Sequence, residues 1–80
     1  MAIVTIPSPL PGTFYRKPSP DQPAFKQDGD AVAAGDTLGL VEVMKTFTPV
    51  AAEAAGRIVR FLVEDEEPVM AGQPILEIES

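Results

Sequence analysis

A single lysine near the middle of the chain is the side chain whose position most clearly suggests chemistry. Lys45 is the only basic residue between Lys26 and Arg57, in a chain whose formal net charge is −6. It lies within residues 41–47, VEVMKTF, with strand-like alternation on both sides. A lysine amine is a nucleophile that can become covalently linked to another group. We therefore interpret Lys45 as a site of covalent attachment at the tip of a hairpin.

An ordinary solvated surface lysine is the alternative interpretation of Lys45. The composition of the presumed turn argues against it. Met44 places a flexible apolar side chain where Asn, Asp or Gly would fold more easily. Neither Met nor Lys readily adopts the positive φ that a tight hairpin turn requires. These residues indicate a turn selected for recognition more than for ease of folding.

The composition excludes several classes of function. The chain of 80 residues contains neither cysteine nor histidine. Disulfides, thiolate-bound metals and Ser-His-Asp or Cys-His catalytic groups therefore cannot be built from it alone. The net charge of −6 argues against nucleic-acid binding, which needs clustered Lys and Arg. The acidic residues 64–67, EDEE, are interpreted as a solvated turn in preference to a metal site or a docking patch.

The apolar residues, 45% of the chain, fall in short runs broken by Gly and Pro. No run approaches the roughly 20 apolar residues that cross a bilayer. The first residues, MAIVT, also lack the positive region and the long apolar stretch of a signal peptide. The sequence therefore predicts a protein without membrane contact and a cytoplasmic location.

The secondary-structure signal is that of an all-β chain. Val, Ile, Thr and Phe cluster in short runs separated by Gly-Asp, Pro-Gly and Pro-rich turns. The alanine-rich residues 50–55 are too few for a stable helix and are interpreted as strand and turn. Eight short strands predict a sandwich or flattened barrel. The predicted strands are Ile3–Ile6, Gly12–Tyr15, Ala31–Val32, Thr37–Val43, Thr46–Val50, Gly56–Val63, Pro68–Val69 and Ile75–Ile78.

The chain repeats itself at an offset of 37 residues. Residues 32–38, VAAGDTL, have a counterpart in residues 69–75, VMAGQPI, and residues 41–42, VE, match residues 78–79, IE, at the same offset. Upstream, residues 12–14 resemble residues 56–58. A two-fold repeated structure places Lys45 where the first half ends and the second begins. We therefore expect Lys45 and the chain ends at opposite poles.

The first half carries about seven residues more than the second. Gly12 precedes Gly35 by 23 positions, whereas Gly56 precedes Gly72 by 16. The extra residues fall between positions 15 and 29, in a segment that holds three of the nine prolines. Proline fits poorly in a paired strand, so this segment is predicted to protrude as a stiff loop.

The hairpin motif and its surroundings resemble a known family. Glu42-Val43-Met44-Lys45 resembles Glu-Ala-Met-Lys, the biotin-attachment motif of biotinyl domains. Residues 8–16, SPLPGTFYR, and 18–21, PSPD, are similar to bacterial biotin carboxyl carrier proteins of acetyl-CoA carboxylase, and residues 35–38, GDTL, continue the similarity at the same spacing. The resemblance covers nearly the whole chain, so residues 1–80 are interpreted as one biotinyl domain.

The resemblance also implies a fold. Biotinyl domains are flattened eight-stranded β-barrels of two four-stranded antiparallel sheets, related by quasi-two-fold symmetry. The carriers of acetyl-CoA carboxylase add a protruding thumb loop between the second and third strands, which corresponds to about residues 16–25 of this chain. The thumb coincides with the extra segment that the repeat reveals.

In function, the resemblance implies that a biotin protein ligase joins biotin, the cofactor, to Lys45 through an amide bond. The chain is then a non-catalytic carrier, which shuttles carboxybiotin between a biotin carboxylase and a carboxyltransferase. The similarity points to acetyl-CoA carboxylase and thus to fatty acid synthesis. Glu42, Met44 and Thr46 are the neighbours expected to contribute to the site, and Lys17 on the thumb is expected within reach of the ureido ring.

Three residues differ from the usual pattern of that family. Val43 replaces Ala, Thr46 replaces Met, and Lys17 stands where thumbs often carry Thr, so a merely solvated Lys17 is the alternative. Two other functions stay open. Lipoyl carriers of 2-oxoacid dehydrogenases share the fold, but their hairpins usually read Asp-Lys-Ala and they lack a thumb. An unmodified β-barrel adaptor that binds protein partners without a cofactor is the third interpretation.

Overall fold

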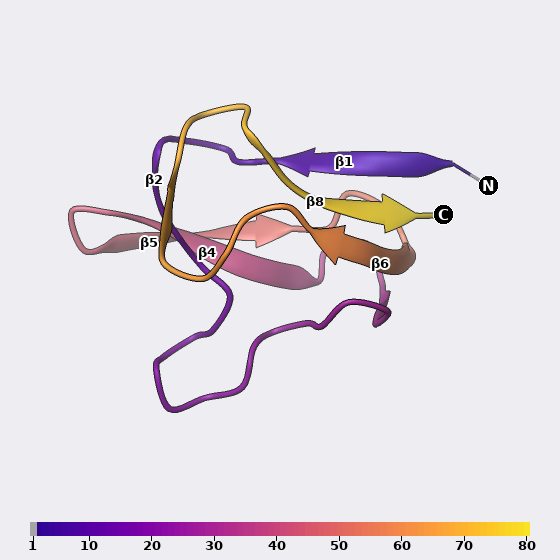
Figure 1. Cartoon of the computed structure of the whole chain (residues 1–80), viewed down its shortest axis with the longest axis horizontal. Helices are drawn as coiled ribbons and strands as arrows, with labels where there is room; N and C mark the ends of the chain where they lie inside the picture. Colours follow the sequence, from indigo (N-terminus) through magenta and orange to yellow (C-terminus); the bar gives the residue numbers. More distant parts are fainter. Residues whose placement is uncertain (1) are drawn as a thin grey trace.

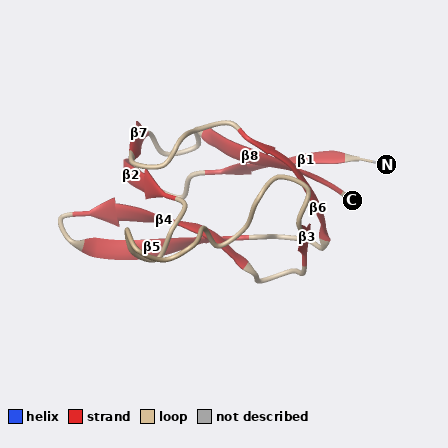
Figure 2. Cartoon of the chain, turned by 60° about the horizontal axis from the view of Figure 1, so that its bottom comes forward, coloured by secondary structure: helices blue, strands red, loops and turns tan. Residues whose placement is uncertain are grey.

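Eight strands form two four-stranded antiparallel sheets in the computed structural model, which describes residues 2–80 (Figures 1 and 2). The strands are β1 (Ile3–Pro7), β2 (Gly12–Tyr15), β3 (Ala31–Val32), β4 (Thr37–Val43), β5 (Thr46–Ala51), β6 (Gly56–Phe61), β7 (Glu67–Val69) and β8 (Pro74–Glu79). One sheet has the order β1-β8-β6-β3 and the other β5-β4-β2-β7. Within residues 2–80, no helix is long and apolar enough to span a bilayer.

The predicted all-β fold is confirmed, and β2, β3 and β4 have the predicted bounds. Strands β1, β5, β7 and β8 are each longer by one residue at one or both ends. Strand β5 continues through Pro49 because it is an edge strand, where the missing N–H of a proline can face away from the ladder. The predicted end of β6 at Val63 is wrong. The strand ends at Phe61, and the Leu62 amide then donates to the Ile75 carbonyl as the chain bends away.

The predicted two-fold repeat extends to the order of the strands. Advancing each strand of β1-β8-β6-β3 by four positions in the cycle of eight gives β5-β4-β2-β7, the order of the other sheet. Each sheet therefore takes two strands from each half of the chain, so the halves interlock. At the far end from the β4–β5 hairpin, Ala2 and Ser80 exchange backbone hydrogen bonds of 3.5 and 3.0 Å (Figure 1). The predicted placement of the hairpin and the chain ends at opposite poles is confirmed.

The core lies between the two sheets and is built from inward-facing residues of all eight strands and two loops. Phe14 is the largest of these side chains and is fully buried. Its ring packs against Phe61, with the ring centroids 6.3 Å apart. A Cβ atom on Gly39 would lie 2.5 Å from the Phe14 ring, so glycine at 39 makes room for it. The buried apolar residues are Ile6, Phe14, Val32, Leu38, Val41, Val50, Ala52, Ile58, Val63, Val69, Ile75, Leu76 and Ile78.

The segment between β2 and β3 forms the thumb, which protrudes below the sheets in Figure 1. The Phe25 amide donates to the Arg16 carbonyl at 2.9 Å and so joins the two ends of residues 16–25. Arg16 also fixes this loop to the second half. Its amide donates to Asp65 Oδ1 at 2.7 Å, and its guanidinium lies 4.0 Å from the centre of the Phe61 ring. The assignment of residues 1–80 to one domain stays a prediction.

Deleting residues 17–24 is expected to leave a folded barrel, because Arg16 and Phe25 are already joined by a backbone hydrogen bond. The deletion removes no residue of the buried core. Cooperative thermal unfolding with a strand-type circular dichroism spectrum is the expected result. A deletion variant without a cooperative transition would show that the thumb is part of the folding unit.

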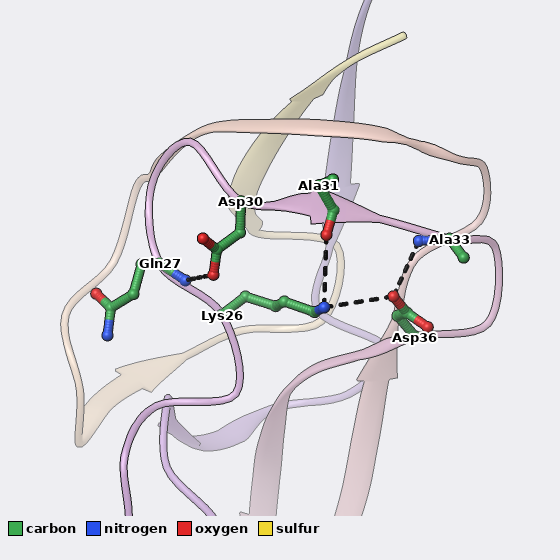
Figure 3. A network of polar contacts seen from close by, with 6 residues as sticks. All are labelled: Lys26, Gln27, Asp30, Ala31, Ala33 and Asp36. Atoms are coloured by element: carbon green, nitrogen blue, oxygen red, sulfur yellow. Dashed lines mark hydrogen bonds and ion pairs between the residues drawn. The ribbon is translucent and has the colours of Figure 1, made fainter.

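The C-terminal end of the thumb, which leads into β3, is held by a second set of contacts (Figure 3). The Lys26 ammonium lies 3.5 Å from Asp36 Oδ2 and 3.4 Å from the Ala31 carbonyl oxygen, to which it donates. The Asp36 carboxylate also accepts the Ala33 amide at 2.9 Å. In the equivalent turn of the second half, the uncharged side chain of Gln73 accepts the Met70 amide at 2.9 Å. The Ala33 amide, and to a lesser degree Lys26, holds the pKa of Asp36 below its ordinary value of 3.8, against an opposing effect of desolvation.

The stabilising contribution of Asp36 is expected to depend on pH. Because its folded-state pKa is lowered, the contribution is present above the ordinary value of 3.8 and is lost as the pH falls through the folded-state pKa. Asp36→Asn keeps an oxygen for the Ala33 amide, as Gln73 does for Met70, but loses the charge. Thermal midpoints measured from about pH 6 to about pH 2 should show the wild type losing its advantage over D36N at the acid end. A constant difference over that range would contradict this prediction.

Candidate attachment site

The tip of the β4–β5 hairpin is a two-residue turn formed by Met44 and Lys45. Val43 and Thr46 are the last paired residues of the two strands. Met44 has a φ of 49° and Lys45 a φ of 68°. Positive φ at both central residues is the requirement of a type I′ turn, for which Asn-Gly is the usual sequence. Met44 and Lys45 thus adopt a backbone conformation that asparagine and glycine adopt more easily.

A carboxylate stabilises this unfavourable turn. Glu42 Oε2 accepts the backbone amide of Lys45 at 2.6 Å. A hydrogen bond to a charged acceptor contributes about 1.5–3 kcal/mol when shielded and less at an exposed position such as this one. The sequence predicted Glu42 as a site residue from the motif alone, without a role. In the structure it fixes the backbone from which the Lys45 side chain extends.

Replacing Glu42 with alanine is expected to loosen the turn while the barrel stays folded. The Lys45 amide would then exchange its proton with solvent faster, because it loses its acceptor. Glu42→Gln retains an oxygen acceptor and should fall between the wild type and E42A. Amide hydrogen exchange followed by NMR measures the effect. Equal exchange at Lys45 in all three proteins would contradict the capping role of Glu42.

The side chains at the tip project into solvent. Lys45 is exposed, and Met44 is 90% exposed. Within residues 2–80, the Lys45 ammonium makes no hydrogen bond and no ion pair. The two sheets extend away from this tip toward the chain ends (Figure 1). Lys45 therefore offers an amine on a long flexible stem that a large partner can reach from several directions.

A cleft of about 480 Å³ lies between the thumb and the sheet that carries the hairpin. Tyr15 of β2 and Phe47 of β5 supply its aromatic surface, with ring centroids 6.0 Å apart. Phe47 is paired with Glu42, one residue pair inside the turn. The cleft thus begins next to the hairpin tip. The other residues that line it are Lys17, Pro18, Ser19, Pro20, Asp65 and Glu66.

The residues predicted for the site fall in two places. Glu42, Met44, Lys45 and Thr46 lie together in the hairpin, and Lys17 lines the cleft under the thumb. Sequence reasoning did not single out the aromatic pair of Tyr15 and Phe47, and it interpreted Asp65 and Glu66 as part of a solvated acidic turn. The alternation in β2 and β5 signals outward-facing rings, but their proximity depends on the intervening strand β4 and was not apparent from spacing.

The acidic residues 64–67 form a turn, as predicted. The Glu67 carboxylate accepts the Glu64 amide at 2.9 Å, in the same way that Asp30 accepts the Gln27 amide at 2.8 Å in the first half. The acidic run is therefore the second copy of a turn that is already acidic at residues 27–30. Among residues 2–80 no group of three or more acidic side chains is placed to hold a metal ion.

The fold agrees with comparisons to known proteins. The family model described as "Biotin-requiring enzyme" matches residues 4–78. The chain belongs to this biotin and lipoyl attachment family.

The similar proteins are carriers and carboxylases. The chain is 36% identical over 76 residues to the biotin carboxyl carrier protein of acetyl-CoA carboxylase from Nostoc and 42% identical over 72 residues to that from Haemophilus influenzae. These matches cover 95% and 90% of the chain but only 42% and 46% of the relatives, so the chain spans less than half of their length.

Two solved structures contain a domain with the same fold. The urea carboxylase of Kluyveromyces lactis superposes with a TM-score of 0.80 at 26% identity, over 99% of this chain and 6% of the carboxylase. A single-chain, multi-domain long-chain acyl-CoA carboxylase also gives a TM-score of 0.80, at 28% identity, over 98% of this chain and 7% of its own. The predicted flattened sandwich of two four-stranded sheets is therefore confirmed.

The residues present fit a biotinyl group. An exposed primary amine at the tip is suited to an amide link. The Tyr15 and Phe47 rings offer an apolar surface to a fused ring system, and the charged residues Lys17 and Glu66 line the same cleft.

Proposed function

We propose that this chain is a biotin carrier module and that Lys45 is its attachment residue. The observation that carries the proposal is the exposed Lys45 side chain on a turn held by Glu42, in a chain whose relatives are named biotin carboxyl carrier proteins. Biotin, once attached, supplies a nitrogen that can hold a carboxyl group. The carrier moves this group between a biotin carboxylase and a carboxyltransferase, which for these relatives are parts of acetyl-CoA carboxylase.

The role of this chain in the attachment reaction is to position the Lys45 amine. The nitrogen of the Lys45 side chain must be unprotonated when it attacks an activated carboxyl group, so a proton has to be removed from it. A biotin protein ligase would supply the base and the activated biotin. This chain supplies the nucleophile on a turn of defined conformation, so that the ligase meets the Lys45 amine in one orientation.

The neighbours of Lys45 have distinct proposed roles. Met44, 90% exposed, offers an apolar contact to the ligase or to the carboxylase partners. Thr46 closes the turn opposite Val43, and its exposed hydroxyl is the group that such partners meet in place of a methionine. The proposed role of Lys17 is to donate to the ureido carbonyl of the attached biotin, and its position in the lining of the cleft next to the hairpin supports this role.

The proposed role is that of a carrier without catalysis of its own. A side chain that presents a group on a flexible stem fits transport between two active sites supplied by partners. The acyl-CoA that is finally carboxylated is set by the carboxyltransferase, and acetyl-CoA is the proposal that the relatives' names support. The cytoplasmic location stays a prediction.

Co-expression with a biotin ligase, and separately with a lipoyl ligase, tests the proposal. Intact mass spectrometry should show one biotinyl addition with the first enzyme and little or no lipoyl addition with the second. Lipoylation alone would identify a lipoyl carrier instead. No addition under either ligase would favour an unmodified adaptor, and both of these outcomes would overturn the proposal.

A further inference from the structure

Glu66 adopts a backbone conformation that glycine adopts more easily. Its φ is 66°, in the left-handed region that side chains with a Cβ rarely adopt. The equivalent residue in the first half, 37 positions earlier, is Gly29 with a φ of 89°. The two turns match closely. The Asp30 amide donates to the Gln27 carbonyl at 3.1 Å, and the Glu67 amide donates to the Glu64 carbonyl at 3.3 Å. The fold therefore favours glycine at 66.

Two carboxylates of this turn, those of Glu64 and Glu66, accept no hydrogen bond within residues 2–80. Asp65 Oδ1 accepts the Arg16 amide at 2.7 Å, and the Glu67 carboxylate accepts the Glu64 amide at 2.9 Å. Glu66 is exposed, and it makes no side-chain hydrogen bond or ion pair with any of residues 2–80. It lines the cleft under the thumb, whereas Glu64 does not. An unfavourable backbone position thus places an acidic residue at the cleft.

The polar groups at this cleft form a complementary set for a cyclic urea. A ureido ring has two N–H donors and one carbonyl acceptor. The Glu66 carboxylate can only accept hydrogen bonds, and the Lys17 ammonium can only donate them. Both line the same cleft as the rings of Tyr15 and Phe47, which suit the apolar part of a fused bicycle.

We propose that Glu66 is a specificity-determining residue of the cleft, which accepts an N–H of the ureido ring and so selects the neutral form of the attached biotin. The inference rests on the proposed function, because it takes biotin on Lys45 as the occupant. A ring nitrogen that bears a carboxylate has lost its N–H and gained a negative charge. The negative charges of Asp65 and Glu66 repel that charge, and among residues 2–80 Lys17 is the single cation in the lining that attracts it. The cleft therefore binds the neutral ring and releases the charged one.

NMR spectroscopy of the biotinylated domain tests the role of Glu66 without an enzyme assay. In the wild type, one ureido N–H should exchange with solvent several-fold more slowly than in free biocytin, and the ring should give nuclear Overhauser contacts to Tyr15 or Phe47. Glu66→Gly should return the exchange to the free value. Its thermal midpoint should be unchanged or raised, because glycine suits this position. Glu66→Gln keeps an acceptor without the charge and should retain part of the protection.

Glu64→Gln is the matched control, since it changes a neighbouring exposed carboxylate of the same turn that does not line this cleft. It should leave ureido exchange as in the wild type. Free-like exchange in the wild type, or equal protection in E66G, would overturn the inference alone. A wild-type domain that the ligase does not biotinylate on Lys45 would overturn the proposed function and this inference with it, and intact mass distinguishes the two cases.

Discussion

Replacing Lys45 with arginine is expected to abolish biotin addition and to leave the fold unchanged. A guanidinium stays protonated at any accessible pH and cannot attack the activated carboxyl group of biotin. The Lys45 side chain is exposed and has no polar partner within residues 2–80, so arginine disturbs no contact. Intact mass after co-expression with a biotin ligase should show complete loss of the biotinyl addition.

Lys17→Arg and Lys26→Arg serve as controls for this result. Lys17 lines the cleft and Lys26 pairs with Asp36, so neither is presented on a hairpin tip. Both variants should be biotinylated to the same extent as the wild type, with the addition mapped to Lys45 by peptide analysis. Biotin found on K45R, or on a residue other than Lys45 in the wild type, would refute the assignment of the attachment residue.

Truncating Phe14 to alanine is expected to give the largest loss of stability. The side chain is fully buried between the sheets, and its ring contacts Phe61 and lies against Gly39. Replacing a buried phenylalanine with alanine costs about 3–5 kcal/mol, as transfer free energy and a cavity. A small domain has a free energy of unfolding of about 5–15 kcal/mol, so this single change removes much of it. Urea denaturation should show the midpoint falling sharply.

Phe47→Ala is the matched control for Phe14→Ala. The same atoms are removed, but Phe47 is 54% exposed on the outer face of its sheet. Its free energy of unfolding should stay within about 1 kcal/mol of the wild type. Similar losses for the two variants would show that the aromatic pair at the cleft contributes to the fold as much as the core does.

The fold could be predicted from the sequence because its signals are local or repeated. Alternation and turn residues located the strands, and three of them have the predicted bounds. The offset of 37 residues predicted the two-fold arrangement, and the strand orders confirm it. The error at Val63 arose because a buried residue continues the apolar alternation after pairing has ended. Val63 is inward-facing but belongs to a loop that closes the core.

The attachment residue could also be proposed from the sequence, whereas its surroundings could not. Lys45 is recognisable because the motif and the midpoint of the repeat coincide. The bond from the Lys45 amide to Glu42 depends on the conformation of the turn. The cleft depends on contacts between segments far apart in sequence, such as Tyr15 with Phe47 and Arg16 with Asp65. Spacing in one sequence does not reveal which of these segments meet.

The paired chain ends make this fold nearly a closed ring. Ala2 and Ser80 face each other through backbone hydrogen bonds, at the place equivalent to Thr46 and Val43 beside the hairpin turn. A short linker from Ser80 to Ala2 would thus complete a second hairpin, and the ring could be opened elsewhere, for example within the thumb. Such a circular permutant would retain both sheets, since no strand would be cut. The order in which the strands are joined is thus separable from the arrangement that presents Lys45.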